Sequence, residues 1–249
     1  MALIVKKFGG SSVANAERVM NVARIVTEDY KKGNDVVVVV SAQGDTTDDL
    51  IAKAEEIYPS NPPKREMDML LSSGEQISIA LLAMAIQKLG FPSVSLLGWQ
   101  AGFSTDSKHT LARIKKINSD RIRNELDKKN IVVVAGFQGL NKYDDITTLG
   151  RGGSDTTAVA IAATLGADLC QIYTDVDGVY TADPEKDPTA TKFEKITYDE
   201  IYNKGLKVMD LTATTMCKEN HLPIVVFNMD VEGNLKKLME GQQIGTIVY

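Results

Sequence analysis

The sequence predicts an α/β fold: a three-layer α/β/α sandwich with a mainly parallel central sheet. Two observations lead to this prediction. Short apolar runs rich in β-branched residues alternate along the chain with longer amphipathic stretches. The short runs are almost continuously apolar, which is typical of strands that helices cover on both faces. The 249 residues could form one large domain or two small ones, and without a long linker we expect a single domain over residues 1–249.

Each element follows from its local pattern. Strands are expected at the apolar runs Ala2–Phe8, Asp35–Ser41, Ser93–Leu97, Ile131–Ala135, Leu169–Tyr173 and Ile224–Phe227. Helices are expected where apolar residues recur at helical spacing, at Ala14–Lys32, Lys64–Leu89, Asp155–Leu165, Leu211–Asn220 and Gly233–Met239. The period is clearest in Lys64–Leu89, whose predicted apolar face is Leu70, Leu71, Gly74, Ile77, Ser78, Leu81, Leu82, Ala85 and Leu89. Loops are expected at Tyr58–Pro63 and Asp183–Thr191.

Composition excludes several classes of protein. With 43% apolar and 24% charged residues, the chain is neither disordered nor collagen-like. Its net charge of −5 argues against a nucleic-acid partner, which would favour a basic surface. Cys170 and Cys217 lie far apart and there are two histidines, so a zinc site or disulfide framework is not expected. The first residues lack a signal-peptide pattern and no apolar run is long enough for a membrane span, so we expect a cytoplasmic protein.

The first motif follows the first predicted strand and contains Lys7, Gly9, Gly10 and Ser11. Two glycines allow backbone N–H groups to approach an anion closely, and the start of a helix adds its dipole. Lys7 supplies a positive charge suited to a phosphoryl group. The alternative interpretation is an ordinary turn between a strand and a helix.

The second motif, Ser41–Asp48, follows the second predicted strand and opens a helix. Thr46 or Thr47 could donate a hydrogen bond to a substrate carboxylate. The alternative is that these residues cap the helix, a common role of threonine and aspartate.

The third motif is Leu71–Glu75, inside the longest predicted helix. Gly74 costs about 1 kcal/mol relative to alanine there, which is easier to tolerate if a ligand or another element packs against it. Glu75 could bind an ammonium group. The alternative is an exposed glutamate at the edge of the apolar face.

The fourth motif, Gly150–Thr157, precedes the helix expected from Asp155. Its three glycines permit close backbone approach, Arg151 offers a planar fork for a carboxylate, and Asp155 lies at the helix start. The spacing matches neither a Walker A loop nor a dinucleotide-binding fingerprint. So many specialised residues in one loop indicate a functional site.

The fifth motif, Thr174–Pro184, follows the fifth predicted strand. Acidic and hydroxyl side chains surround Gly178 and could hold a ribose, an adenine edge or a metal ion. The spacing of a calcium-binding EF-hand loop is absent.

Together and in this order, these motifs resemble the aspartate kinases of the amino acid kinase family. The resemblance rests on Lys7–Val13, Ser41–Ile51, Leu71–Ser78, Gly98–His109, Gly136–Gly139, Thr148–Ala158 and Thr174–Pro184. It implies transfer of the γ-phosphoryl group of ATP to the side-chain carboxylate of L-aspartate. Mg²⁺ is expected to accompany ATP, and the sequence identifies no protein ligand for it. The resemblance also makes self-association conceivable.

The resemblance implies a role for each motif residue. Lys7 would neutralise the transferring phosphoryl group, Gly9 and Gly10 would donate from their backbone N–H groups, and Asp155 would orient Lys7. The expected aspartate-binding residues are Thr47, Glu75, Arg151 and Ser154, with Arg151 on the α-carboxylate and Glu75 on the ammonium. The expected ATP-binding residues are Ser11, Thr174, Asp175, Tyr180, Asp183, Pro184 and Lys207.

The last quarter of the chain departs from this pattern. Glu185 stands where the resemblance leads us to expect an arginine, and residues 185–249 resemble bacterial uridylate kinase instead, notably at Ile196–Glu200 and Gly205–Asp210. We therefore expect a chimera with its seam near Pro184–Asp187. The regulatory ACT domains of typical aspartate kinases are not seen, so inhibition by lysine or threonine is not expected. The alternatives are a uridylate kinase and a folded protein that binds ATP with little catalysis.

Overall fold

The computed structural model describes residues 1–174, 177–182, 184, 187–206, 209, 211–228, 234, 237, 242 and 244–249. Within these residues, eight strands form a main sheet in the order β10-β12-β11-β9-β1-β2-β6-β3. All six predicted strands belong to it: β1 (Leu3–Phe8), β2 (Asp35–Val40), β3 (Ser93–Leu96), β6 (Ile131–Ala135), β9 (Leu169–Thr174) and β11 (Ile224–Asn228). They pair in parallel from β3 to β11. The short edge strands β10 (Lys195–Ile196) and β12 (Thr246–Val248) were not predicted, and β12 runs antiparallel to β11.

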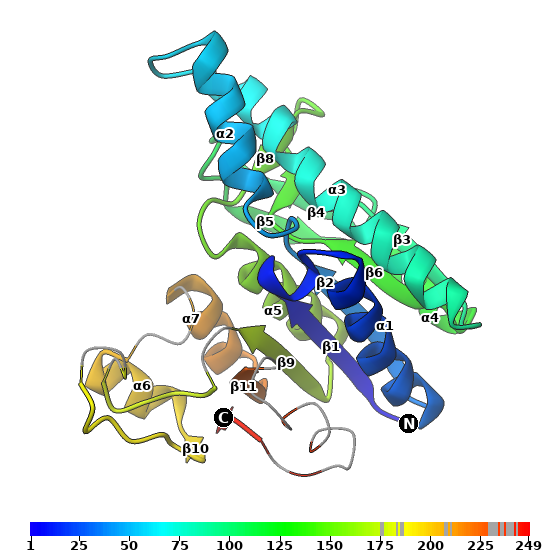
Figure 1. Cartoon of the computed structure of the whole chain (residues 1–249), viewed down its shortest axis with the longest axis vertical. Helices are drawn as coiled ribbons and strands as arrows, with labels where there is room; N and C mark the ends of the chain where they lie inside the picture. The colour runs from blue at the N-terminus through cyan, green and yellow to red at the C-terminus, as the bar shows by residue number, and fades with distance from the viewer. Residues whose placement is uncertain are drawn as a thin grey trace.

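Helices cover both faces of this sheet, which confirms the predicted sandwich (Figure 1). Val36, Val38 and Val40 of β2 pack towards α1 (Ala16–Lys31) and α3 (Lys64–Lys88). Val37 and Val39 point to the opposite face, where α4 (Asp120–Asp127), α5 (Gly153–Leu165), α6 (Tyr198–Lys204) and α7 (Leu211–Glu219) supply the apolar partners. Side chains alternate between the faces of a strand, so a run of five valines is buried on both sides.

A second sheet, absent from the sequence prediction, adjoins the carboxyl ends of β3 and β6. Its order is β5-β4-β7-β8, formed by Ile114–Ile117, Phe103–Thr105, Gln138–Leu140 and Ile146–Thr148. Strands of three or four residues are too short to show a reliable alternation of polar and apolar residues. Figure 1 shows this sheet alongside the first half of α3, above the main sheet in that view, and α2 (Thr46–Ile57) packs against α3.

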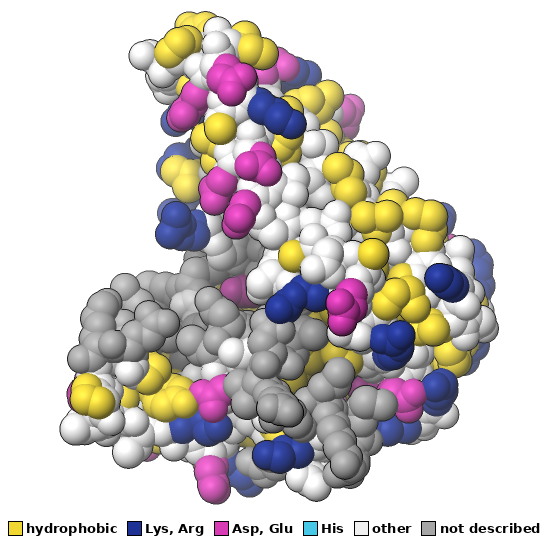
Figure 2. Space-filling model, in the orientation of Figure 1, with side chains coloured by type: hydrophobic (Ala, Val, Ile, Leu, Met, Phe, Trp, Pro, Cys, Tyr) yellow, Lys and Arg dark blue, Asp and Glu magenta, His cyan; other side chains and the backbone are white. Residues whose placement is uncertain are grey.

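The 25-residue helix α3 runs along both sheets. Its length and composition would suit a membrane span, yet 56% of its apolar window is buried within the molecule. The prediction that Ile77 and Leu81 face the core is wrong, since they are 51% and 38% exposed. The buried face instead follows Gly74, Ser78 and Leu82, and hydrophobic side chains gather along the outer face of α3 (Figure 2).

The remaining predicted helices begin and end within two residues of the observed ones, apart from Gly233–Met239, most of which lies outside the described residues. The predicted loop Tyr58–Pro63 joins α2 to α3. Because β1, β2 and β6 are adjacent and parallel, the loops that follow them meet at one edge of the main sheet. That edge faces the second sheet.

Candidate active site

A pocket of about 370 Å³ lies at this edge, where the loops after β1, β2 and β6 meet the start of α5. It is lined by Lys7, Gly10, Ser41, Ala42, Gly44, Thr47, Glu75, Phe137, Gly150, Arg151, Gly152, Gly153, Ser154 and Asp155. Every residue that the resemblance assigned to aspartate lines it. Four separate motifs of the sequence thus converge on one cavity.

Lys7 and Asp155 form the central ion pair of the pocket. Lys7 is the penultimate residue of β1, and its Nζ lies 2.8 Å from Oδ1 of Asp155 in the first turn of α5. Both side chains are largely buried, at 12% and 20% exposure. An ammonium group held this way stays aimed into the cavity without needing to reorient when a ligand arrives.

The glycines after β1 allow two loops to pack backbone against backbone. The Gly44 N–H donates to the Gly10 carbonyl at 3.0 Å, and a Cβ on Gly10 would lie only 2.6 Å from the Ala42 carbonyl oxygen. A side chain at Gly10 would therefore push the two loops apart. Gly9 lies beside the Lys7 ammonium and Ser11 is exposed on the short helix η1 (Ser11–Val13), but neither lines the pocket.

Glu75 is a buried acid that reaches the pocket from α3, so the interpretation of an exposed glutamate is wrong. It is 3% exposed, and its Oε1 accepts a hydrogen bond from the Ala42 N–H at 3.1 Å. Its Oε2 is buried and has no hydrogen-bond partner among the described residues. Burial raises the pKa of Glu75 to about 7. A Cβ on Gly74 would lie 2.7 Å from Ala42 Cβ, so the glycine in mid-helix permits this close approach.

Arg151 enters the pocket from a loop with two left-handed glycines. Gly150 and Gly152 have φ values of +81° and +76°, a region that costs side-chain-bearing residues energy. Within the described part of the chain, no ion-pair partner for Arg151 is found, and the residue is exposed. The same cavity therefore holds a guanidinium without an ion-pair partner and, on Glu75, a carboxyl oxygen without a hydrogen-bond partner, both judged among the described residues.

Thr47 and Ser154 add hydroxyl groups to the pocket wall. The alternative that threonine caps α2 does not hold, because the N-cap position is Asp45, with no side-chain cap, and Thr46 Oγ1 donates to the Gln43 carbonyl instead. Gly136 leaves room for the Ser154 side chain, because a Cβ on Gly136 would lie only 2.6 Å from Ser154 Oγ.

The residues expected to bind ATP are placed only in part. Asp175, Asp183 and Lys207 lie outside the described residues, and Thr174 is described through its backbone at the end of β9. The Tyr180 hydroxyl donates to Asp177, and this hydrogen bond raises the pKa of Tyr180 to about 12. Pro184 is exposed in a turn. In the described ranges, no group of three or more His, Cys, Asp or Glu side chains is arranged to hold a metal ion.

Sequence reasoning missed the pocket residues Ser41, Ala42, Gly44 and Phe137 as individual contributors. Ala42 acts through its backbone N–H, and Phe137 has a left-handed φ of +72° with its N–H donating to Thr157 Oγ1 at 3.0 Å. Groups that act through the backbone leave little signal in side-chain chemistry. The left-handed backbone of Phe137 leaves no signal in the sequence.

Comparison with known proteins gives a consistent answer. A model of the amino acid kinase family matches residues 2–228. An aspartokinase of Geobacillus stearothermophilus is 55% identical over 229 residues, which cover 91% of this chain and 56% of that protein. The aspartate kinase structure from Synechocystis is 43% identical with a TM-score of 0.82, covering 99% of this chain and 39% of that one. The chain thus spans about half the length of the curated relatives it matches.

The fold is also that of a UMP kinase from Bacillus anthracis. That structure has a TM-score of 0.73 and is 20% identical, and the match covers 99% of this chain and 95% of the other. At this level of identity, the likeness concerns the fold.

Proposed function

The chain belongs to the amino acid kinase family, and we propose that it acts as the catalytic part of an aspartate kinase. The reaction would transfer the γ-phosphoryl group of ATP to the side-chain carboxylate of L-aspartate, forming ADP and 4-phospho-L-aspartate. Support comes from aspartokinase relatives that are 50–55% identical over about nine tenths of the chain.

The observation that carries the proposal is that one pocket holds a carboxyl oxygen of Glu75 and the guanidinium of Arg151, neither of which has a partner among the described residues. Aspartate has an α-ammonium, an α-carboxylate and a reacting carboxylate. Glu75, whose buried Oε2 accepts no hydrogen bond from the described residues, would take the ammonium, and Arg151 would take the α-carboxylate in a bidentate fashion. Thr47 and Ser154 would donate hydrogen bonds. The reacting carboxylate would then point towards Lys7.

The chemistry needs little beyond positioning and neutralisation of charge. The acceptor carboxylate is ionised at neutral pH, so no general base is required. Lys7 would stabilise charge on the phosphoryl group during in-line transfer, and Asp155 would hold it in place. Backbone N–H groups at Gly9 and Gly10 would bind phosphate oxygens, with Ser11, Thr174, Asp175, Tyr180, Asp183, Pro184 and Lys207 on the nucleotide side. Mg²⁺ bound to ATP would add positive charge, mainly through phosphate oxygens and water.

The test is ADP release from Mg·ATP with L-aspartate, with UMP and with no acceptor, combined with hydroxylamine trapping of the acyl phosphate. Aspartate-dependent ADP together with hydroxamate is the expected result. UMP-dependent release would establish a uridylate kinase instead. ATP binding without turnover would establish a folded nucleotide-binding protein with little catalysis.

Three narrower proposals accompany this one. We propose that residues 1–249 act as one kinase domain in the cytoplasm, and that the domain self-associates, which sedimentation analysis would test.

The chimera is likewise a proposal supported by residue patterns after Pro184, and the 229-residue match to aspartokinases extends past the expected seam. The UMP arm of the assay shows whether those patterns carry acceptor specificity.

A further inference from the structure

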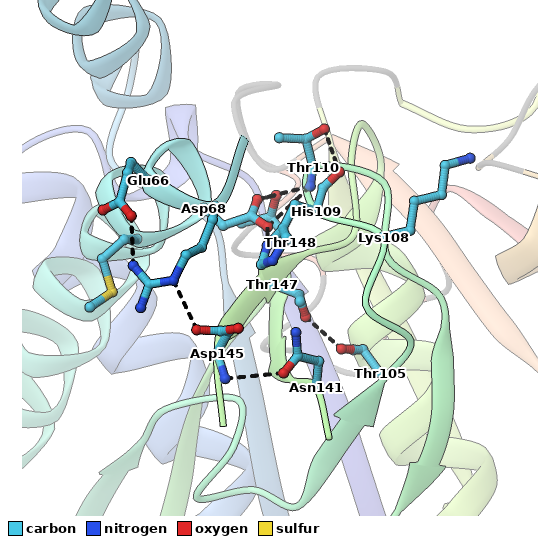
Figure 3. A network of polar contacts seen from close by, with 12 residues as sticks. Glu66, Asp68, Thr105, Lys108, His109, Thr110, Asn141, Asp145, Thr147 and Thr148 are labelled. Carbon is cyan, nitrogen blue, oxygen red and sulfur yellow. Dashed lines mark hydrogen bonds and ion pairs between the residues drawn. The ribbon is translucent and has the colours of Figure 1, made fainter. Parts of the chain in front are cut away.

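A buried carboxylate outside the pocket ties α3 to two other segments, at residues 109–110 and at Thr148 (Figure 3). Asp68 on α3 is fully buried. Its Oδ2 accepts a hydrogen bond from His109 Nδ1 at 2.7 Å, and its Oδ1 accepts one from Thr148 Oγ1 at 2.6 Å. The Thr110 N–H donates to both oxygens, at 3.0 and 3.1 Å. A carboxylate can only accept, so His109 must present Nδ1 as a donor.

The network holds the chain in an unfavourable conformation at Thr110. This residue has a φ of +68°, which is rare for a β-branched residue and costs about 1–3 kcal/mol. Such a conformation persists only where its surroundings impose it. Here the two hydrogen bonds from the Thr110 N–H to Asp68 impose it.

The constrained segment then packs against the start of the Arg151 loop. The Ala112 N–H donates to the Thr148 carbonyl at 2.9 Å. A Cβ on Gly150 would lie 2.8 Å from Leu111 Cδ2 and 3.3 Å from the Thr110 carbonyl oxygen. The path from Asp68 to the backbone immediately before Arg151 is therefore one of direct contacts.

We propose that Asp68 is a positioning residue for substrate binding: through Thr110, Leu111 and Thr148, its carboxylate sets the course of the loop that presents Arg151. This inference rests on the proposed function, because it assigns Arg151 to the acceptor carboxylate. Stability alone does not call for a charged group here, since buried ionic networks can often be replaced by apolar side chains without loss. Positioning of Arg151 does call for a charged group, because Arg151 has no ion-pair partner in the described residues to fix its direction.

The test compares three variants in steady-state kinetics. Asp68→Asn keeps the shape but turns one acceptor into a donor, and Thr148→Val removes one hydroxyl from the network. Both are expected to raise the KM for aspartate about tenfold or more, because small misplacements of binding groups have large effects, while the KM for ATP changes less than twofold. Thr148→Ser keeps the hydroxyl and should stay near wild type.

The matched control is Asp145→Asn. Asp145 also accepts a bond from α3, from Arg65 Nε at 2.9 Å, but that pair is partly exposed, and among the described residues neither partner forms a hydrogen bond or ion pair with residues 109–112. Figure 3 shows Asp145 apart from the contacts of Asp68. Exposed pairs contribute little, so this variant should behave as wild type. Equal increases in the KM values for ATP and aspartate, or an unchanged KM for aspartate in both network variants, would overturn the proposal.

Hydrogen–deuterium exchange separates this proposal from the proposed function, since it needs no activity. In Asp68→Asn, amides of residues 148–153 should exchange at least tenfold faster than in the wild type, while those of β3 remain unchanged. If the wild type shows no turnover with aspartate, the proposed function fails and exchange still decides whether Asp68 orders the loop. Unchanged exchange at residues 148–153 would contradict the positioning role.

Discussion

Glu75 illustrates, at the scale of one residue, how a buried acid can reduce stability. Burial raises its pKa from 4.5 to about 7. Between these two pH values, the folded protein holds a proton on Glu75 that the unfolded chain has already released. Raising the pH from 4.5 to about 7 therefore lowers the free energy of unfolding, and above pH 7 the cost is constant at about 3 kcal/mol. This cost keeps an unpaired carboxylate oxygen in the pocket.

Replacing Glu75 should reverse this effect. Glu75→Gln retains an oxygen for the Ala42 N–H and removes the buried charge. We expect it to raise the free energy of unfolding at pH 8 by up to about 3 kcal/mol and to have little effect at pH 4.5. Urea denaturation at both pH values measures the difference. An equal change at the two pH values would show that the ionisation of Glu75 is not responsible.

Lys7 is expected to matter for turnover rather than for folding. Its ammonium faces the pocket, paired with Asp155. Lys7→Ala should lower kcat by about a hundredfold or more, because one electrostatic contact to the transition state is lost, while the circular dichroism spectrum stays unchanged. The control is Lys53→Ala, an exposed lysine on α2. A loss of less than tenfold in Lys7→Ala would rule out the assigned role.

At the scale of the element, β1 presents two consecutive lysines to opposite faces. Lys7 enters the pocket, whereas Lys6 is fully buried beside α1, with its Nζ 2.6 Å from Asp29 Oδ2 and 3.0 Å from the Tyr173 hydroxyl. Burial lowers the pKa of Lys6, but the neighbouring Tyr173 and Asp29 together raise it by more than burial lowers it. The pKa of Lys6 is therefore raised overall. For Asp29, burial raises the pKa, and Lys6 lowers it by more.

Breaking this pair should be costly. Asp29→Asn leaves a buried ammonium without its counter-charge and should lower the free energy of unfolding by about 3 kcal/mol. Because the pKa of Asp29 is lowered in the folded state, this contribution is present above pH 4 and lost as the pH falls through the folded pKa. Asp35→Asn, which breaks the exposed pair with Lys129, is the control and should change stability by less than about 1 kcal/mol. Equal losses in the two variants would show that burial of the pair is unimportant.

The elements also show what the sequence could reveal. Strands buried on both faces, such as β2 and β6, carry continuous apolar runs and were predicted nearly to the residue. The second sheet was missed because its short strands owe their place to tertiary contacts. The pocket residues Lys7, Gly10, Arg151 and Asp155 were predicted as site residues because glycines and charges cluster in the loops that follow strands. The network of Asp68 and His109 was missed because it joins residues 41 positions apart and depends on a fold that local patterns do not encode.

At the scale of the whole molecule, one helix supports both sheets. The side chains of α3 contact the main sheet through Leu82 and Ile86, the pocket through Glu75 and the network through Asp68. A ligand in the pocket would therefore contact α3 together with the loops after β1, β2 and β6 and the start of α5. We expect its binding to stabilise the molecule as a unit.

Thermal unfolding tests this expectation. L-Aspartate at a hundred times its Kd should add about 2.7 kcal/mol to the stability of the native state, which is a rise in Tm of about 5 to 10 °C for a chain of this length. UMP should cause no shift, and Glu75→Gln should lose most of the response to aspartate. A shift with UMP in place of aspartate would reassign the acceptor.

The buried acid in the pocket has a consequence for the solution around the protein. At pH 7 about half of the unliganded molecules carry a proton on Glu75, given its pKa of about 7. A substrate ammonium bound to that carboxylate favours its ionised form. Capture of aspartate as proposed would therefore expel about half a proton per site into the medium. The heat of binding would then vary with the ionisation enthalpy of the buffer, so that substrate uptake and local acidity are linked through one side chain.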